Sequence, residues 1–140
     1  MKRVAMAVWQ GGIKDGKGHI STDSQVLNQT QYSFSTRFED GNGTNPEELV
    51  AAAHAACFSM ALSAQLGNAK ITPERISTTA TLTMDKLEAG WTITAIHLDV
   101  HGKIPGQDKK AFETAANNAK AGCPISRVLN AKITMEAHLD

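Results

Sequence analysis

Cysteine is scarce in this chain, and neither sign of charge is in excess. Only two cysteines occur among 140 residues, which is too few for a disulfide-rich secreted scaffold. Fourteen basic residues balance fourteen acidic ones, so overall charge favours neither nucleic acid nor an anionic membrane surface as a partner. These absences predict a soluble cytoplasmic protein, in which a disulfide between the two cysteines would be transient.

Long apolar segments are also missing. The first nine residues include two basic side chains, but their apolar run is interrupted at Gln10 and Gly11, short of the roughly 7–15 residues at the centre of a signal peptide. No uninterrupted run reaches the roughly 18 apolar residues that indicate a membrane span. The length of 140 residues predicts one domain, covering residues 1–140.

The first half of the chain predicts strands followed by one long helix. Alternating apolar residues and glycine-rich turns indicate an antiparallel hairpin within residues 4–24, and residues 32–38 resemble a further strand. A helix is then expected from a cap at Asn45 to about Leu66, with Pro46 at its first position and Glu48 as a capping-box acid.

The second half predicts a hairpin, two shorter helices and a closing strand. Residues 76–84 and 91–100 alternate with period two, and the change of apolar phase near Ala95 predicts a β-bulge. Asp108 can cap a helix that ends at Gly122, and a second helix should run from Cys123 to Leu129. Residues 133–139 then alternate as a strand.

The long helix is apolar on all sides. From Leu49 to Leu62 only His54 and Ser59 are polar, a pattern typical of a helix enclosed on every side. Alanines at positions 51, 52, 53, 55 and 56 would let another helix approach closely. One hypothesis is a homodimer whose two long helices cross antiparallel near Ala52; the alternative is a core helix covered by its own sheet.

Both cysteines lie where a thiol can react. Cys57 is in the middle of the long helix, so it needs a nearby cation to ionise at neutral pH. Arginine suits this role because its planar fork can contact both sulfur and a substrate oxygen. Of the four arginines, Arg37 is the preferred candidate, with Glu47 or Glu48 to hold its guanidinium.

The spacing of Glu47 and Cys57 bears on the dimer. Ten residues correspond to about 15 Å along one helix, too far for one arginine to bridge. In an antiparallel crossing at Ala52, position 47 of one copy lies level with position 57 of the other, so each site would combine Cys57 with the partner's Glu47. The alternatives are a first-turn acid favoured by the helix dipole for Glu47 and an exposed strand-end charge for Arg37.

Two segments together carry a resemblance to a known family. They are residues 45–62, NPEELVAAAHAACFSMAL, and residues 122–129, GCPISRVL. At this separation they resemble the OsmC/Ohr family of osmotically inducible and organic-hydroperoxide-resistance proteins, with the OsmC branch the nearer. The similarity extends over nearly the whole chain.

The resemblance implies an α+β fold, an OsmC-like intertwined homodimer with antiparallel sheets wrapped around two long central helices. The sites would lie at the subunit interface and use no metal, haem or flavin. By motif position, Cys57 is the peroxidatic cysteine, Cys123 the resolving one, and Arg37 and Glu47 the polar pair. The Ohr branch takes its arginine from nearer the amino terminus, so Arg3 remains a rival to Arg37.

The implied activity is reduction of organic hydroperoxides, and more weakly of hydrogen peroxide. An external dithiol or lipoyl-type protein, rather than glutathione, would reduce the disulfide. Cys123 at a helix start is expected to have a lowered pKa. Phe58, Met60 and Ile125 are candidates for a pocket for alkyl hydroperoxides or, equally, for the core. His54 is expected to be a core histidine.

Other functions stay open. The chain could be a redox-sensing or small-molecule-binding stress protein without steady turnover. A metal site at His54, Cys57 and Cys123 lacks a fourth ligand, and His97 and His101 would lie about 13 Å apart along a strand. A cysteine hydrolase using Cys57 needs a base that the sequence does not indicate.

Overall fold

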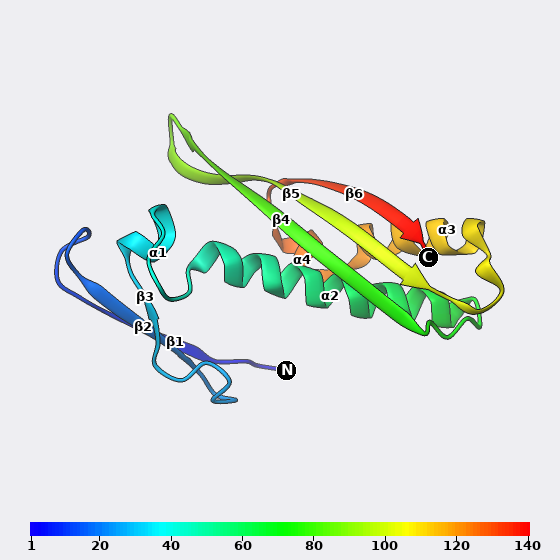
Figure 1. Cartoon of the computed structure of the whole chain (residues 1–140), viewed down its shortest axis with the longest axis horizontal. Helices are drawn as coiled ribbons and strands as arrows, with labels where there is room; N and C mark the ends of the chain where they lie inside the picture. The colour runs from blue at the N-terminus through cyan, green and yellow to red at the C-terminus, as the bar shows by residue number, and fades with distance from the viewer. The chain divides into compact units, whose positions relative to one another are not determined.

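The computed structural model describes residues 1–140, whose contacts group them into two units, Met1–Leu49 and Val50–Asp140. The first unit is a three-stranded antiparallel sheet of β1 (Ala5–Gln10), β2 (Lys17–Thr22) and β3 (Thr30–Tyr32), shown in blue to cyan in Figure 1. The hairpin predicted within residues 4–24 is confirmed.

A short helix, α1 (Phe34–Phe38), replaces most of the strand predicted for residues 32–38. That prediction was wrong because Ser33 and Thr36 form a capping box. The Ser33 side chain accepts from the Thr36 backbone N–H, and the Thr36 hydroxyl accepts from the Ser33 backbone N–H. These two bonds start a helix where the alternating pattern indicated an extended chain.

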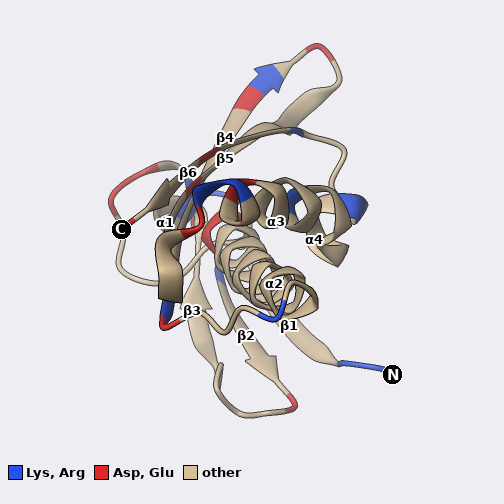
Figure 2. Ribbon diagram, turned by 90° about the vertical axis from the view of Figure 1, so that its right-hand side faces the viewer, with Lys and Arg blue, Asp and Glu red and all other residues tan.

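The long helix α2 (Pro46–Asn68) is confirmed. Asn45 caps it, since its Oδ1 accepts from the Glu48 N–H at 2.8 Å. The Glu48 carboxylate accepts from the Thr44 hydroxyl at 2.7 Å, a different partner from the capping box that the sequence predicted. After Glu48 the helix has no charged residue, and its ribbon is uniformly tan in Figure 2.

The second unit contains a mixed sheet of β4 (Arg75–Leu87), β5 (Gly90–Lys103) and β6 (Lys132–Leu139). β4 and β5 pair antiparallel. Their register shifts between Thr83 and Met84, which leaves Thr94 without a pairing partner and confirms the bulge predicted near Ala95. β6 pairs parallel to β5, whereas the sequence predicted antiparallel sheets. The chain crosses back between these strands through a 3₁₀ turn (Pro105–Gln107), α3 (Lys109–Gly122) and α4 (Pro124–Val128), and such a crossover returns it in the same direction.

The core of this unit lies between one face of the sheet and the helices α2 and α3. Both views place these helices on the same side of the sheet (Figures 1 and 2). The fully buried apolar side chains are Phe58, Leu62 and Leu66 from α2, Ile96, Leu98 and Val100 from β5, and Phe112 and Ala116 from α3. The α+β class is confirmed.

The single chain buries α2 along one stripe only, whereas the sequence predicted enclosure on every side. The buried residues recur every fourth position: His54, Phe58, Leu62 and Leu66. Ala52, Ala56 and Met60 remain exposed, Met60 at 76%. An apolar helix face is therefore left uncovered within one chain.

The length and composition of α2 also meet the criterion for crossing a membrane, which core helices of soluble proteins meet as well. The helix nevertheless contains no uninterrupted apolar run of the length expected for a membrane span, because polar residues such as His54, Ser59 and Ser63 interrupt it.

Candidate active site

Cys57 and Cys123 lie side by side in the second unit. Cys57 is half-buried in the middle of α2, and Cys123 is buried between α3 and α4. Their sulfurs are 2.6 Å apart, with the Cys123 thiol donating to Cys57. Because a disulfide spans about 2.05 Å, only a small movement separates these thiols from a covalent bond. The proximity expected of a redox pair is thus present.

The turn between α3 and α4 fixes the position of Cys123. Its N–H donates to the Ala119 carbonyl at 2.9 Å and closes α3, while its own carbonyl accepts from Arg127 at 3.0 Å and opens α4. Pro124 suits the first position of α4, since it has no N–H to leave unpaired. The backbone of Cys123 is therefore bonded on both sides.

Burial raises the pKa of the Cys57 thiol. The adjoining Cys123 raises this pKa further, first through the hydrogen bond between the two thiols and then through charge repulsion, and a hydrogen bond with the Ile125 backbone lowers it. None of these influences is a cationic side chain. Within its own unit Cys57 is thus mostly protonated at neutral pH, which is unfavourable for a nucleophile.

His54 joins α2 to the turn that carries Cys123. Its Nε2 lies 2.8 Å from the Ser126 hydroxyl, and the ring is fully buried, which lowers the pKa of His54. The prediction that His54 is a core histidine is confirmed, because the ring is buried. Its Nδ1, however, has no hydrogen-bond partner. Nothing in the sequence singled out Ser126 as this partner.

Arg37 and Glu47 form an ion pair in the first unit. The Arg37 Nε and Nη2 donate to Glu47 Oε1 at 2.9 and 2.7 Å. The Glu47 side chain is only 15% exposed, and its buried Oε2 accepts no hydrogen bond. Of Glu47 and Glu48, the two predicted partners of Arg37, it is Glu47 that binds the guanidinium. Arg3, the rival cation, is exposed, and its Nη1 donates to the backbone of Lys2.

An apolar pocket of about 200 Å³ adjoins Arg37 in the first unit. Its wall is formed by Trp9, Ile13, Tyr32, Ser33, Phe34, Arg37, Phe38 and Pro46. Gly18 lies opposite both Trp9 and Tyr32 in the sheet, and a Cβ there would collide with both rings, so glycine is needed for their approach to 5.5 Å. This pocket was not predicted from the sequence, in which the only signal for it was the cluster of aromatic residues near Arg37.

The pocket residues predicted from the sequence lie elsewhere. Phe58 is fully buried in the core of the second unit, which is the alternative to a pocket residue that the sequence left open. Its spacing from His54 and Leu62 puts it on the buried stripe of α2. Met60 is exposed on the opposite face, and Ile125 is half-buried in α4.

An α+β fold that presents two adjoining thiols defines a thiol-based redox protein. Residues 39–138 match the model of the family described as OsmC-like protein. The chain is 56% identical over 133 residues to peroxiredoxin OsmC of Escherichia coli strain K12, which covers 95% of this chain and 93% of the relative. The chain therefore belongs to the OsmC-like protein family.

Solved structures agree with this assignment. The crystal structure of an organic hydroperoxide resistance protein OsmC from Legionella pneumophila superposes with a TM-score of 0.70 at 26% identity, covering 96% of both chains. That of the organic hydroperoxide resistance protein OhrB of Bacillus subtilis gives 0.71 at 25% identity, covering 96% of this chain and 98% of the other.

Proposed function

We propose that this chain is a thiol-dependent peroxidase that reduces organic hydroperoxides and, more weakly, hydrogen peroxide. The observation that carries the proposal is the 2.6 Å separation of Cys57 and Cys123. Family membership supports it, since the relatives are named a peroxiredoxin and organic hydroperoxide resistance proteins. The reaction takes place in the cytoplasm and involves neither nucleic acid, membrane nor cofactor.

The two thiols divide the reaction into two steps. The Cys57 thiolate attacks one oxygen of the O–O bond, the alcohol leaves with a proton, and a sulfenic acid forms on Cys57. The Cys123 thiolate then attacks that sulfur and releases water, so one hydroperoxide and two thiols yield an alcohol, water and a disulfide. An external dithiol or lipoyl-type protein reduces the disulfide by exchange.

The first step needs a cation, because burial raises the Cys57 pKa. We infer that Arg37, oriented by Glu47, supplies it from a second copy of the chain. The exposed stripe of Ala52, Ala56 and Met60 on α2 supports a homodimer in which two such helices cross. With Ala52 at the crossing, the first turn of one helix lies level with Cys57 of the other.

The aromatic pocket beside Arg37 suits the alkyl group of the substrate. Four rings and an isoleucine offer apolar contact, and the guanidinium at the wall can bind a peroxide oxygen. An organic hydroperoxide gains from burial of its alkyl group there, whereas hydrogen peroxide has none to bury. Residues 1–140 thus act as one functional domain, although the reactive thiols and the polar pair belong to different units.

A redox sensor is the second candidate, and the same proximity of Cys57 and Cys123 favours it, since sensor cysteines often lie next to a resolving cysteine. The two functions differ in turnover. A peroxidase consumes an alkyl hydroperoxide continuously while a lipoyl-type dithiol is present, whereas a sensor is oxidised once.

The test of this function is hydroperoxide consumption with excess dithiol. We expect many turnovers for the natural protein, none for Cys57→Ser, and for Cys123→Ser a single oxidation followed by over-oxidation to sulfinic acid. Consumption limited to one equivalent per chain would identify a sensor. Full activity in Cys57→Ser would overturn the assignment of the nucleophile.

A further inference from the structure

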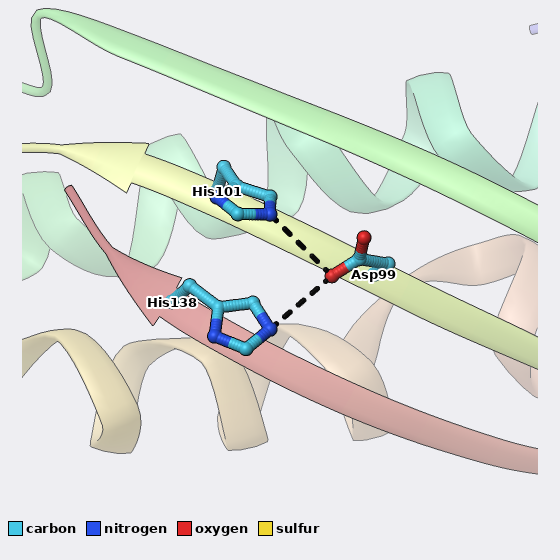
Figure 3. Close-up of side chains that lie close together, drawn as sticks. All are labelled: Asp99, His101 and His138. Carbon is cyan, nitrogen blue, oxygen red and sulfur yellow. Dashed lines mark ion pairs between the residues drawn. The ribbon is translucent and has the colours of Figure 1, made fainter.

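Polar side chains cover the outer face of the β4–β5–β6 sheet, opposite the core. Along β5, even-numbered residues such as Leu98 and Val100 point into the core, so the intervening Asp99 and His101 point outward. The parallel register sets His101 beside His138 on β6. His138 therefore meets Asp99 and His101, which are distant from it in the sequence, on one exposed face (Figure 3).

Their ligand atoms converge on a small volume. Asp99 Oδ1 lies 3.3 Å from His138 Nε2 and 3.7 Å from His101 Nε2, and one ligand atom from each residue fits within 4.8 Å of the others. Ligands bound to zinc at about 2.1 Å in a tetrahedron are about 3.4 Å apart. The spacing therefore matches a tetrahedral site with little rearrangement.

Neighbouring contacts prepare the ligands for a cation. His101 Nδ1 lies 2.9 Å from Asp140 Oδ1, and Arg75 holds Asp140 at 3.0 Å. A carboxylate on one imidazole nitrogen keeps the proton there and directs the lone pair of the other, Nε2, toward a metal. Asp99 Oδ1 is buried yet accepts no hydrogen bond, so an anionic oxygen between the rings has its coordination unmet.

We propose that Asp99, His101 and His138 bind a divalent transition-metal ion, with zinc as the best fit. Imidazole ligands favour zinc, copper or nickel over magnesium and calcium, which prefer oxygen alone. Water completes the coordination, or Glu136, whose Oε2 lies 3.8 Å from His138 Nε2. The ion would fasten the C-terminal strand β6 to β5, a structural role separate from the thiol chemistry.

The sequence did not reveal this site because His138 is far from Asp99 and His101 in the chain. His97 lies four residues before His101 on the same strand, and its Nδ1 contacts the Thr134 hydroxyl at 2.8 Å. The partner that matters, His138, reaches His101 through the parallel pairing of β5 with β6.

Calorimetric titration with Zn²⁺ tests the site. Since thiolates also bind zinc, the parent protein carries Cys57→Ser and Cys123→Ser. We expect one Zn²⁺ per chain, no binding of Mg²⁺, and a rise in Tm that a chelator reverses. Asp99→Asn and His138→Gln should each weaken Zn²⁺ binding more than tenfold, and Asp140→Asn about tenfold through the lost orientation of His101.

His97→Gln is the matched control, because it removes an imidazole from the same strand and face without touching the cluster. Its zinc affinity should equal that of the parent. Tm values in chelator show that each variant is folded before zinc is added. Absence of a Zn²⁺ isotherm in the parent, or equal affinity in the parent and His138→Gln, would overturn the proposal.

Discussion

At the scale of single residues, the chemistry depends on how Cys57 loses its proton. Burial and the adjoining Cys123 raise the pKa of Cys57, so the thiolate fraction in this environment rises with pH. A guanidinium close to the sulfur would reverse this effect by stabilising the thiolate. Arg37, held by Glu47, is the cation that we infer for this role.

Replacement of that cation should therefore change the pH dependence of the activity. For Arg37→Ala we expect the rate of hydroperoxide consumption at neutral pH to fall about tenfold or more, since a nearby opposite charge moves a pKa by about 1–3 units. The loss should shrink as the pH rises toward the raised Cys57 pKa, because hydroxide then ionises the thiol without help. Rates of Cys57 oxidation measured from neutral to alkaline pH test this.

Arg3→Ala is the control, because Arg3 is exposed and pairs only with a backbone carbonyl. The pH profile of Arg3→Ala should match that of the natural protein. Arg37→Lys should be faster than Arg37→Ala at neutral pH, because lysine restores the charge without the planar fork. A larger loss in Arg3→Ala than in Arg37→Ala would assign the cation to Arg3.

Single residues also show how far sequence reasoning reached. The need of a guanidinium for a carboxylate predicted Glu47 or Glu48 as the partner of Arg37, and in the structure the partner is Glu47. The pocket was missed because Trp9, Tyr32 and Phe38 are brought together by strand pairing and by α1. Phe58 stayed open between pocket and core because residue type alone does not show which side of an apolar helix faces the core.

At the scale of elements, local signals predicted most of the fold. Asn45 and Asp108 accept the cap hydrogen bonds expected of them, and the phase change on β5 coincides with its bulge. The exceptions depended on interactions that periodicity does not encode. The Ser33–Thr36 capping box produced α1, and the parallel direction of β6 goes with the helical crossover between β5 and β6.

The packing of α3 on β5 requires a glycine. A Cβ at Gly102 would collide with the ring of Phe112, which is fully buried. We expect Gly102→Ala to reduce the free energy of unfolding by about 1–3 kcal/mol, because the ring must shift in a close-packed core. Denaturant unfolding monitored by circular dichroism measures the loss.

Gly122→Ala is the matched control at the end of α3, where no atom lies within 4 Å of the position that a Cβ would occupy. Its stability should be unchanged or slightly higher, since alanine favours a helix over glycine by about 1 kcal/mol. Equal stability of the two variants would show that Phe112 is not in contact with Gly102.

At the scale of the whole molecule, the uncovered face of α2 is the feature that one chain does not explain. The helix has no charged residue after Glu48, and Ala52, Ala56 and Met60 are exposed. A second copy would cover this face, and its Arg37 and Glu47 pair would supply the cation that Cys57 needs. A variant that loses the dimer should therefore also lose the peroxidase activity.

Ala52→Arg tests this link by adding bulk and charge at the crossing that we infer. Sedimentation should show a dimer for the natural protein and a monomer for the variant, with peroxidase activity reduced at least tenfold by loss of the partner's cation. Asn118→Arg, on the exposed side of α3, is the control and should remain dimeric and active. An active monomer would refute the shared site.

The most direct measurement concerns the bond between the two sulfurs. Reduced protein is mixed with one equivalent of an alkyl hydroperoxide, digested without reductant and analysed by mass spectrometry. We expect one linked peptide pair containing Cys57 and Cys123, with loss of two hydrogen masses and formation of one equivalent of alcohol. Consumption of the hydroperoxide with both thiols still free, or with disulfides only between chains, would contradict the mechanism.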